Sequence, residues 1–284
     1  MNGQPRVKVF IGSGESSLIE RKTAIHSLRK HTTRDLDIYV FNGTHNAVRL
    51  NDGEPFLAPM SLRVKYRNIN EFSLYRFLIP ELFNYQGKAI YIDSDTVCLS
   101  DIGELFDTQM GGADFLAKQE AYPGEGLWGL SVMLIDCQRC RFDLEVIVTE
   151  VDAGVYSMKD FSCMSPRFLA HHPYTIGRLD PVWNVFDQWD DRTKLIHYTN
   201  LYTQPWKHPN HPYGELWFSY FNEALDEGHV TTEDVELSMK RACVRRDLLN
   251  GNFRSPSSFL GLVKQLAAPI KKVFKNVASR ISVA

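Results

Sequence analysis

Short apolar runs separated by turn-forming residues open the chain. Val7–Ile11 is apolar and stops at Gly12-Ser13-Gly14, which predicts a buried strand and a tight turn. Leu18–His31 carries its apolar residues on one stripe, which predicts a helix. Leu36–Phe41, closed by Asn42-Gly43, predicts a second strand. Strand, helix, strand in this order predicts an α/β fold with parallel strands.

The pattern continues with mixed segments and further apolar runs. Residues 46–70 hold glycine and prolines among mixed side chains, which indicates a loop. Phe72–Phe83 is predicted to be helical, and Lys88–Ile92 is predicted to be a strand. Further strands are expected at Ala113–Ala117, Ser131–Ile135 and Lys194–His197, and a helix is expected at Arg141–Val151.

The character of the chain changes near Val230. Thr232–Asn250 predicts a charged helix, and Phe259–Val283 has apolar residues at helical spacing with five basic residues and no acid. We therefore expect a main domain at 1–228 and a helical extension at 229–284. The basic stretch, 255–284, is expected to bind an anionic membrane surface, or else to pack on the main domain.

Composition narrows the classes of function. The chain has 284 residues, 44% of them hydrophobic, and a formal net charge of −2, which disfavours a nucleic-acid partner. Without a signal peptide or an apolar run of 18 residues, we expect a cytoplasmic protein, peripheral on the inner face of the cell membrane. The five cysteines show no disulfide framework, and Cys137 and Cys140 are expected to be reduced thiols rather than a redox or zinc pair.

The candidate functional residues lie at the end of the third predicted strand, in Tyr91–Thr96. Successive side chains alternate along an extended chain, so Asp93 and Asp95 point the same way, about 7 Å apart along the backbone. Two convergent carboxylates repel each other unless a cation lies between them, and oxygen ligands suit Mn²⁺ or Mg²⁺. The alternative is a solvated turn or a helix cap. The preceding buried strand favours the metal site, because ligands in open α/β sheets bind at the carboxyl ends of strands.

The same region resembles glycosyltransferase family 8, which includes glycogenin and bacterial lipooligosaccharide galactosyltransferases. Phe72–Leu82 is similar to the arginine-bearing helix of that family, and Lys88–Thr96 is similar to its D-x-D strand. Other resembling segments follow in the family's order, over roughly residues 6–220: Val7–Gly14, Ser131–Asp136, Trp183-Asn184, Leu195–Thr199 and Gln204–Lys207. The resemblance implies a GT-A type, Rossmann-like mixed and mostly parallel sheet flanked by helices, with 1–228 as catalytic domain.

The resemblance also implies roles for residues. Asp93, Asp95 and His197 would hold Mn²⁺ (or Mg²⁺) against the donor diphosphate, and Arg76 would act with the two acids in catalysis. For Arg76 an ion pair with those acids is the alternative, and for His197 a structural role. The residues implied to bind the nucleotide sugar are Ile11, Gly12, Ser13, Glu15, Arg76, Ser94, Ser131 and Lys207. Gly12 and Gly14 would let the backbone approach the nucleotide.

The implied reaction is retaining transfer of a hexose from a UDP-sugar to a glycan or lipid-linked acceptor. Departures from the family pattern are Gln204-Pro205-Trp206 for K-P-W, Trp128–Ser131 for F-N-A/S-G, and a missing D-Q-D. These departures are expected to affect the sugar and acceptor side, while the metal side is preserved. Two alternatives stay open: a degenerate member that binds nucleotide sugar or glycan without turnover, and a sugar-nucleotide nucleotidyltransferase. No nucleophile can be chosen among the loop acids Asp160, Asp180, Asp187, Asp190 and Asp191.

Overall fold

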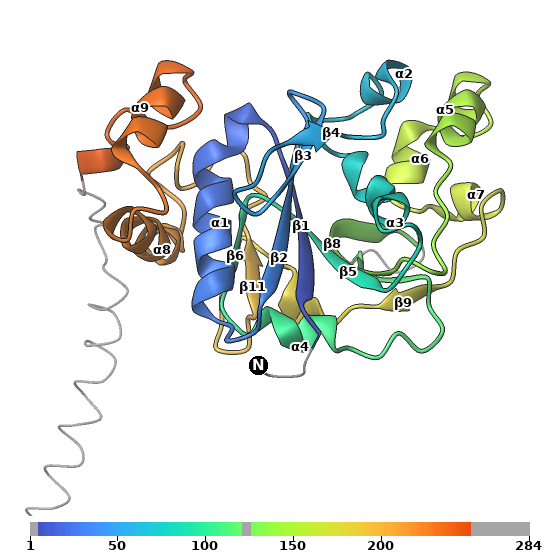
Figure 1. The fold of residues 1–284 in the computed structure, drawn as a ribbon, viewed down its shortest axis with the longest axis horizontal. Helices are drawn as coiled ribbons and strands as arrows, with labels where there is room; N and C mark the ends of the chain where they lie inside the picture. The colour runs from blue at the N-terminus through green and yellow to red at the C-terminus, as the bar shows by residue number, and fades with distance from the viewer. Residues whose placement is uncertain (1–4, 121–125, 251–284) are drawn as a thin grey trace, which may run out of the picture.

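An eight-stranded mixed sheet forms the centre of the molecule (Figure 1). The computed structural model describes residues 5–120 and 126–250. The strand order is β4-β3-β2-β1-β5-β8-β7-β9. Its strands are β1 (Val7–Ser13), β2 (Leu36–Asn42), β3 (Ala47–Leu50), β4 (Phe56–Leu57), β5 (Lys88–Asp93), β7 (Phe115–Gln119), β8 (Trp128–Asp136) and β9 (Ile176–Arg178). β2, β1 and β5 are parallel neighbours, whereas β8 runs antiparallel to both β5 and β7. The expected α/β fold is thus confirmed.

A small second sheet joins distant parts of the chain. It has the order β10 (Val185–Phe186), β11 (Leu195–His197), β6 (Thr96–Cys98). β11 pairs antiparallel with β6, which places His197 opposite Thr96. This pairing brings a late segment of the chain to the residues that follow β5.

Helices cover both faces of the large sheet (Figure 1). On one side lie α1 (Leu18–Lys30), α8 (Gly214–Asp226) and α9 (Thr232–Lys240), packed around Trp206, Trp217 and Phe221. The other helices are α2 (Leu62–Lys65), α3 (Ile79–Leu82), α4 (Ile102–Phe106), α5 (Leu144–Asp152), α6 (Met158–Ser162) and α7 (Pro166–Leu169). Short 3₁₀ turns lie at Glu15–Ser17, Tyr75–Leu78, Pro181–Trp183 and Leu248–Asn250.

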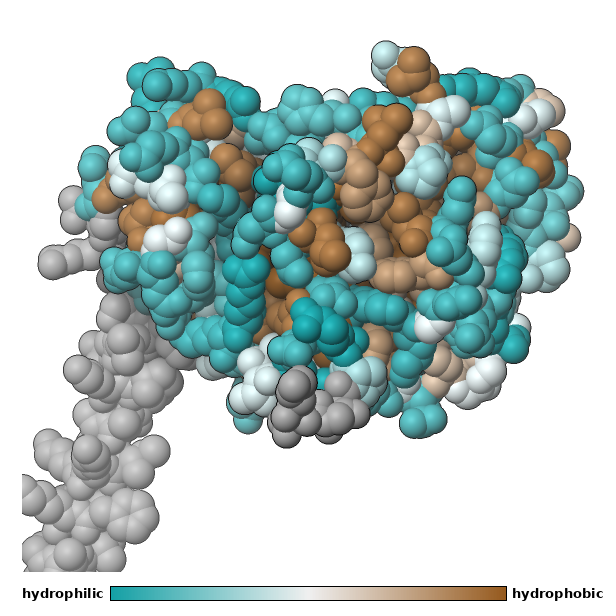
Figure 2. All heavy atoms as spheres, in the orientation of Figure 1, coloured by the Kyte–Doolittle hydropathy of each residue, from teal (hydrophilic) through white to brown (hydrophobic). Residues whose placement is uncertain are grey.

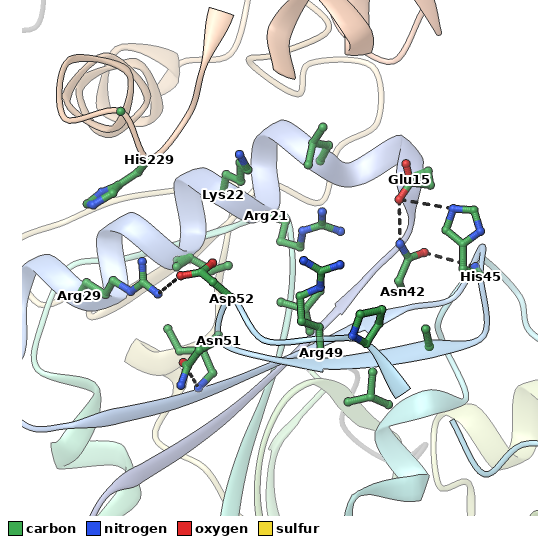
Figure 3. Close-up of a pocket in the computed structure, with 18 residues that line it drawn as sticks. Glu15, Arg21, Lys22, Arg29, Asn42, His45, Arg49, Asn51, Asp52 and His229 are labelled. Atoms are coloured by element: carbon green, nitrogen blue, oxygen red, sulfur yellow. Dashed lines mark hydrogen bonds and ion pairs between the residues drawn. The ribbon is translucent and has the colours of Figure 1, made fainter. Parts of the chain in front are cut away.

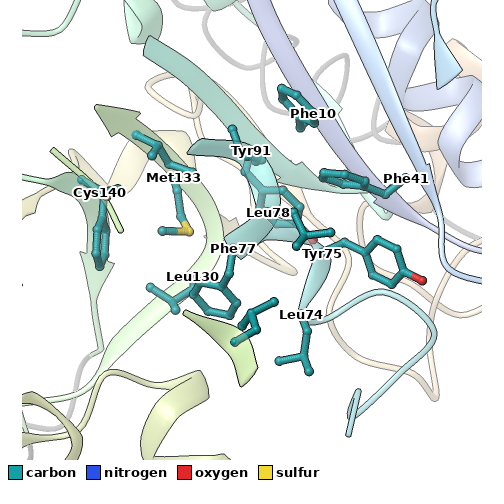
Figure 4. Packing of buried hydrophobic residues seen from close by; sticks show 14 of the residues in the cluster. Phe10, Phe41, Leu74, Tyr75, Phe77, Leu78, Tyr91, Leu130, Met133 and Cys140 are labelled. Atoms are coloured by element: carbon teal, nitrogen blue, oxygen red, sulfur yellow. The ribbon is translucent and has the colours of Figure 1, made fainter. Parts of the chain in front are cut away.

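Both faces of the central strands are buried, which explains their continuous apolar sequences. On β5, Ile90 and Ile92 face one apolar cluster, while Tyr91 faces another that also contains Phe10 and Phe41 (Figure 4). Side chains of a strand alternate between faces, so Asp93 shares the face of Tyr91. Asp93, the last residue of β5, therefore lies beside a packed aromatic layer.

Three predicted elements differ from the structure. Residues 46–70 are not a plain loop, because they contain β3, β4 and α2. The predicted helix Phe72–Phe83 is a 3₁₀ turn followed by the single turn of α3. The predicted helix Thr232–Asn250 ends at Lys240, because Ala242 adopts a left-handed conformation with φ of 56°. The basic tail, 255–284, lies outside the described residues.

The C-x-x-C pair lies in the core. Cys137 and Cys140 are free, fully buried thiols within the aromatic cluster. Burial raises the pKa of Cys137 to about 12, which suppresses the thiolate that redox or zinc chemistry needs. The interpretation of these residues as ordinary thiols is the one that the structure supports.

Some apolar side chains remain on the surface. Over β4 and α2, Figure 2 shows apolar residues gathered on one face, and Phe56, Leu57, Leu62, Tyr66 and Ile69 are exposed there. Contiguous apolar patches of this kind often mark interaction surfaces. Among the described residues, no helix is long and apolar enough to cross a membrane.

Candidate active site

The candidate site lies where β1 and β5 end. Parallel pairing places Gly12 of β1 beside Asp93 of β5. The small sheet then adds His197, which lies opposite Thr96 in the antiparallel pair. Three segments that are far apart in sequence thus meet at one edge of the sheet.

Asp93, Asp95 and His197 form a set with the composition of a metal centre. Each offers one ligand atom, and these three atoms lie within 4.8 Å of one another. His197 Nε2 lies 2.8 Å from Asp95 Oδ1. Two carboxylates and one imidazole are ligands for a divalent cation such as Mn²⁺, and they leave coordination positions for other oxygen ligands. The residues that the family resemblance implied therefore come together and fit such an ion.

Asp93 is fixed by Tyr91 and Arg76. The Tyr91 hydroxyl donates to Asp93 Oδ1 at 2.6 Å, and Arg76 Nη2 donates to the same oxygen at 3.2 Å. Burial raises the pKa of Asp93, and Asp95 adds to that rise, although Arg76 and His197 act against it. A cation bound here would favour the charged carboxylate.

Arg76 is a buried residue that ties β5 to its neighbours. Its guanidinium carbon lies 4.5 Å above the Tyr91 ring, Nε donates to Ser73 O at 2.9 Å, and Nη1 donates to Leu130 O. The ion pair with Asp93, which the sequence offered as an alternative role, is present. Contact of Arg76 with a donor stays a prediction.

A contact of the second ring nitrogen, Nδ1, fixes the orientation of His197. Nδ1 lies 3.2 Å from Oδ1 of Asn184, which is fully buried. The Asn184 side-chain nitrogen donates to Ser131 Oγ at 2.9 Å, so the carboxamide oxygen faces the imidazole. An Nδ1–H that donates to this oxygen leaves Nε2 free to bind a metal. Burial lowers the pKa of His197, but the carboxylates of Asp95, Asp93 and Asp187 together outweigh this effect, and the pKa is raised.

The first predicted nucleotide contacts lie along the end of β1. Ile11 is buried in the core cluster, so its side chain contacts protein. Gly12 has no free space either, because a Cβ there would lie 2.1 Å from the Tyr91 hydroxyl. The missing side chain of Gly12 thus makes room for Tyr91, and contact of its backbone with a nucleotide stays a prediction. Ser13 Oγ accepts from Arg21 at 2.8 Å.

Glu15 lies at the mouth of a pocket of about 620 Å³ between α1 and β2–β3 (Figure 3). It accepts from Asn42 at 2.7 Å and from Arg241 at 2.6 Å. Burial raises the pKa of Glu15, but these hydrogen bonds and the charges of Arg241 and Arg21 together outweigh it and leave the pKa lowered. Arg21 and Arg49 also line this pocket, which gives it a basic wall (Figure 3).

The remaining predicted contacts are spread over the site. Ser94 is buried between the two acids, Ser131 accepts from Asn184, and Lys207 is exposed after the segment that carries His197. Four of the five loop acids have structural partners: Asp160 and Asp180 cap short helices, Asp190 binds Arg192, and Asp187 accepts from Thr199 and His211. None of these four therefore stands out as a nucleophile, and the fifth, Asp191, is exposed.

Sequence reasoning missed Gln204 and Glu20. Buried Gln204 replaces the family's lysine, and its Nε2 donates to Asp95 Oδ2 at 3.3 Å and to Tyr198 O at 3.0 Å. This departure from the family touches the predicted metal side, contrary to expectation. Glu20 is 4% exposed, and burial raises its pKa to about 8, with Asp95 adding to the rise and Lys207 opposing it. No local pattern marks Glu20, and the changed K-P-W motif marks Gln204 only as a departure from the family, without indicating its contact with Asp95.

Comparison with known proteins bears on this geometry. The model of the family described as glycosyl transferase family 8 matches residues 9–125, which include both acids and Arg76. The resemblance to family 8 is confirmed. Because His197 and Asn184 lie beyond the matched residues, their roles rest on the geometry.

Solved glycosyltransferases share the fold. The galactosyltransferase LgtC has a TM-score of 0.58 at 15% identity, over 79% of this chain and 100% of that one. The bifunctional glycosyltransferase WbbM has a TM-score of 0.57 at 16% identity, over 84% of this chain and 52% of that one, so the chain spans about half of WbbM. GlyE of Streptococcus pneumoniae TIGR4 has a TM-score of 0.54 at 14% identity, over 85% and 65%. The GT-A fold type is thereby confirmed.

A curated relative, Protein CDI of Arabidopsis thaliana, is 28% identical, over 58% of this chain and 70% of that protein. The solved structures show the shared fold, and the family 8 match supports glycosyl transfer as the class of reaction.

Proposed function

We propose that the protein is a retaining glycosyltransferase that moves a hexose from a UDP-sugar to a glycan or lipid-linked acceptor with the assistance of Mn²⁺. The observation that carries the proposal is the convergence of Asp93, Asp95 and His197 at the carboxyl end of β5, with ligand atoms within 4.8 Å of one another. Two of these residues lie in the family 8 match.

One set of residues would bind the cation, and another would contact the donor. Asp93, Asp95 and His197 would hold the cation, and a cation here stabilises the negative charge that grows on a departing nucleotide diphosphate. Arg76 keeps Asp93 in place, and exposed Lys207 is free to approach diphosphate oxygens. Ser13, Ser94 and Ser131 offer hydroxyls near the same edge.

Stereochemical retention is proposed from the family resemblance. Asp160, Asp180, Asp187 and Asp190 already cap helices or bind other side chains. Same-face attack, in which the donor phosphate helps to deprotonate the acceptor, needs no protein nucleophile. This route is compatible with a site whose nearest acids would be occupied by a cation.

The decisive experiment measures donor binding and donor hydrolysis with and without Mn²⁺. Asp95→Asn keeps the shape of the side chain and removes its charge, while Asp35→Asn neutralises an exposed acid before β2 and serves as control. Since such a cation contributes several kcal/mol and each 1.36 kcal/mol is tenfold, we expect Asp95→Asn to lower the hydrolysis rate by about a thousandfold. Asp35→Asn should match the wild type.

The outcomes of this experiment distinguish the three hypotheses about function. Mn²⁺-dependent thermal stabilisation by one nucleotide sugar, lost in Asp95→Asn, supports the site and identifies the sugar. Stabilisation with no hydrolysis or transfer would favour a degenerate family member that binds without turnover. The departure of Trp128–Ser131 from the family motif supports that alternative. Synthesis of a nucleotide sugar from a sugar phosphate would favour the nucleotidyltransferase. Binding that ignores both Mn²⁺ and Asp95→Asn would refute the proposed metal role.

A lipid-linked acceptor and a peripheral position on the inner membrane face belong to the same proposal. Their support is the acid-free basic stretch 255–284, where each basic residue near an anionic surface adds about 1 kcal/mol of attraction. Full-length protein should sediment with vesicles that contain phosphatidylglycerol and should stay in solution with neutral vesicles. Equal behaviour with both vesicles would remove this part of the proposal.

A further inference from the structure

A second group of metal-ligating side chains lies where α8 meets α1. His26 lies on α1, Glu227 is the residue after α8, and His229 follows in the same turn. One ligand atom from each lies within 4.8 Å of the others. Figure 3 shows His229 reaching from this turn toward α1. The group shares no residue with the site at the end of β5.

The separations match those of ligands around one small ion. His26 Nδ1 and His229 Nδ1 lie 2.9 Å apart, and Glu227 Oε2 lies 3.8 Å from the first and 3.6 Å from the second. Bonds of about 2.0–2.2 Å to a tetrahedral zinc ion place two ligand atoms about 3.3 Å apart. The carboxylate contacts are too long for hydrogen bonds and close to this edge length.

The buried histidine also has an outer carboxylate in place. His26 is 3% exposed, and its Nε2 has no hydrogen-bond partner among the described residues, but lies 3.4 Å from Glu223 Oε2. A metal on Nδ1 fixes the proton on Nε2, which then points to this carboxylate. Zinc-binding histidines characteristically donate their second N–H to a carboxylate in this way.

We propose that His26, Glu227 and His229 bind one Zn²⁺ ion, which joins α8 to α1. Two imidazoles and one carboxylate favour zinc over manganese, because affinity at nitrogen-rich sites rises along the series from Mn²⁺ toward Cu²⁺ and Zn²⁺. Glu227 and His229 are partly exposed, so water has access to a fourth position. The ion would fasten the turn after α8 to α1.

The test titrates Zn²⁺ into the full-length chain carrying Asp93→Ala and Asp95→Ala, so that the first site does not contribute. Calorimetry should show one tight site per chain. Adding His229→Ala should weaken binding at least tenfold, and adding Glu227→Gln should weaken it less. Adding His171→Ala, at an exposed histidine remote from the cluster, is the matched control and should change nothing. His229 is chosen because it is half-exposed, whereas loss of buried His26 could disturb folding.

A second readout uses Co²⁺ in place of Zn²⁺. Nitrogen and oxygen ligands give visible absorption without the strong thiolate band that cysteine ligands would add, and this spectrum should vanish with His229→Ala. The proposal is overturned if no stoichiometric zinc binds, or if binding survives His229→Ala unchanged. The first result would make the contact an ordinary hydrogen bond between two histidines. Neither result bears on donor binding at Asp95, so the two proposals fail separately.

Discussion

Glu20→Gln should stabilise the protein progressively as the pH rises. Burial raises the pKa of Glu20 from 4.5 to about 8, so the folded state keeps a proton that the unfolded chain releases. The native state therefore binds more protons between these two values, and its stability falls as the pH rises from 4.5 to 8. Glutamine resembles the protonated acid and does not titrate, so the variant escapes this loss.

The size of the effect follows from the shift. A difference of 8 − 4.5 = 3.5 pKa units, at 1.36 kcal/mol per unit, sets a ceiling of about 5 kcal/mol. Relaxation of α1 and water entry around the charged form reduce this figure. Part of the full change lies below pH 5 and above pH 8, so the interval between these two values holds at most about 3.5 kcal/mol of it. We expect the gap in unfolding free energy between Glu20→Gln and wild type to grow by about 1.4–3.5 kcal/mol from pH 5 to pH 8.

Urea unfolding at several pH values, with EDTA present, measures this gap. Glu236→Gln, at an exposed acid on α9, is the control and should show no growing gap. Because Asp95 contributes to the raised pKa of Glu20, a parallel series with Mn²⁺ in place of EDTA should show a smaller gap. A gap that is equal at pH 5 and pH 8 would refute the reasoning about the buried proton.

Three further substitutions test the supports of the site. Asn184→Ala removes the acceptor that orients His197, so Mn²⁺ affinity in a direct titration should fall about 10–100-fold. A folded variant with unchanged affinity would dismiss that role. Gly12→Ala forces a methyl group against the Tyr91 hydroxyl, so the unfolding free energy measured in urea should fall by about 1–3 kcal/mol, and the rate of donor hydrolysis should fall with it. Stability equal to wild type would mean that this packing relaxes freely. Gln204→Leu removes a donor to the second D-x-D acid and should weaken Mn²⁺ binding by about 1–3 kcal/mol in the same titration, and an unchanged constant would count against the contact.

The parts of the fold that the sequence predicted are those with a local cause. β1, α1, β2 and β5 follow from apolar runs and turn residues, and their observed bounds lie within two residues of the predicted ones. Residues 46–70 were misjudged, because β3 and β4 form by pairing at the edge of the sheet rather than by apolar patterning.

The candidate site divides in the same way. Asp93 and Asp95 follow a buried strand and could be predicted from that context alone. His197 needed the order of family motifs, since β11 reaches these acids only through its pairing with β6. Glu20 and Gln204 were missed because their importance arises from burial beside residues that are remote in sequence.

The two acids of the D-x-D motif are held by different parts of the chain. Asp93 is held by Tyr91 and Arg76, from β5 and the turn before it. Asp95 is held by the late segment instead: its backbone oxygen accepts from Tyr198 at 2.9 Å, and its side chain meets His197 and Gln204.

A cation between these acids would therefore bridge the part of the chain inside the family 8 match and the part beyond it. It follows that glutamine in place of the family's lysine changes the environment of a proposed metal ligand directly. Metal affinity, rather than acceptor choice, is where this departure from the family should be felt first.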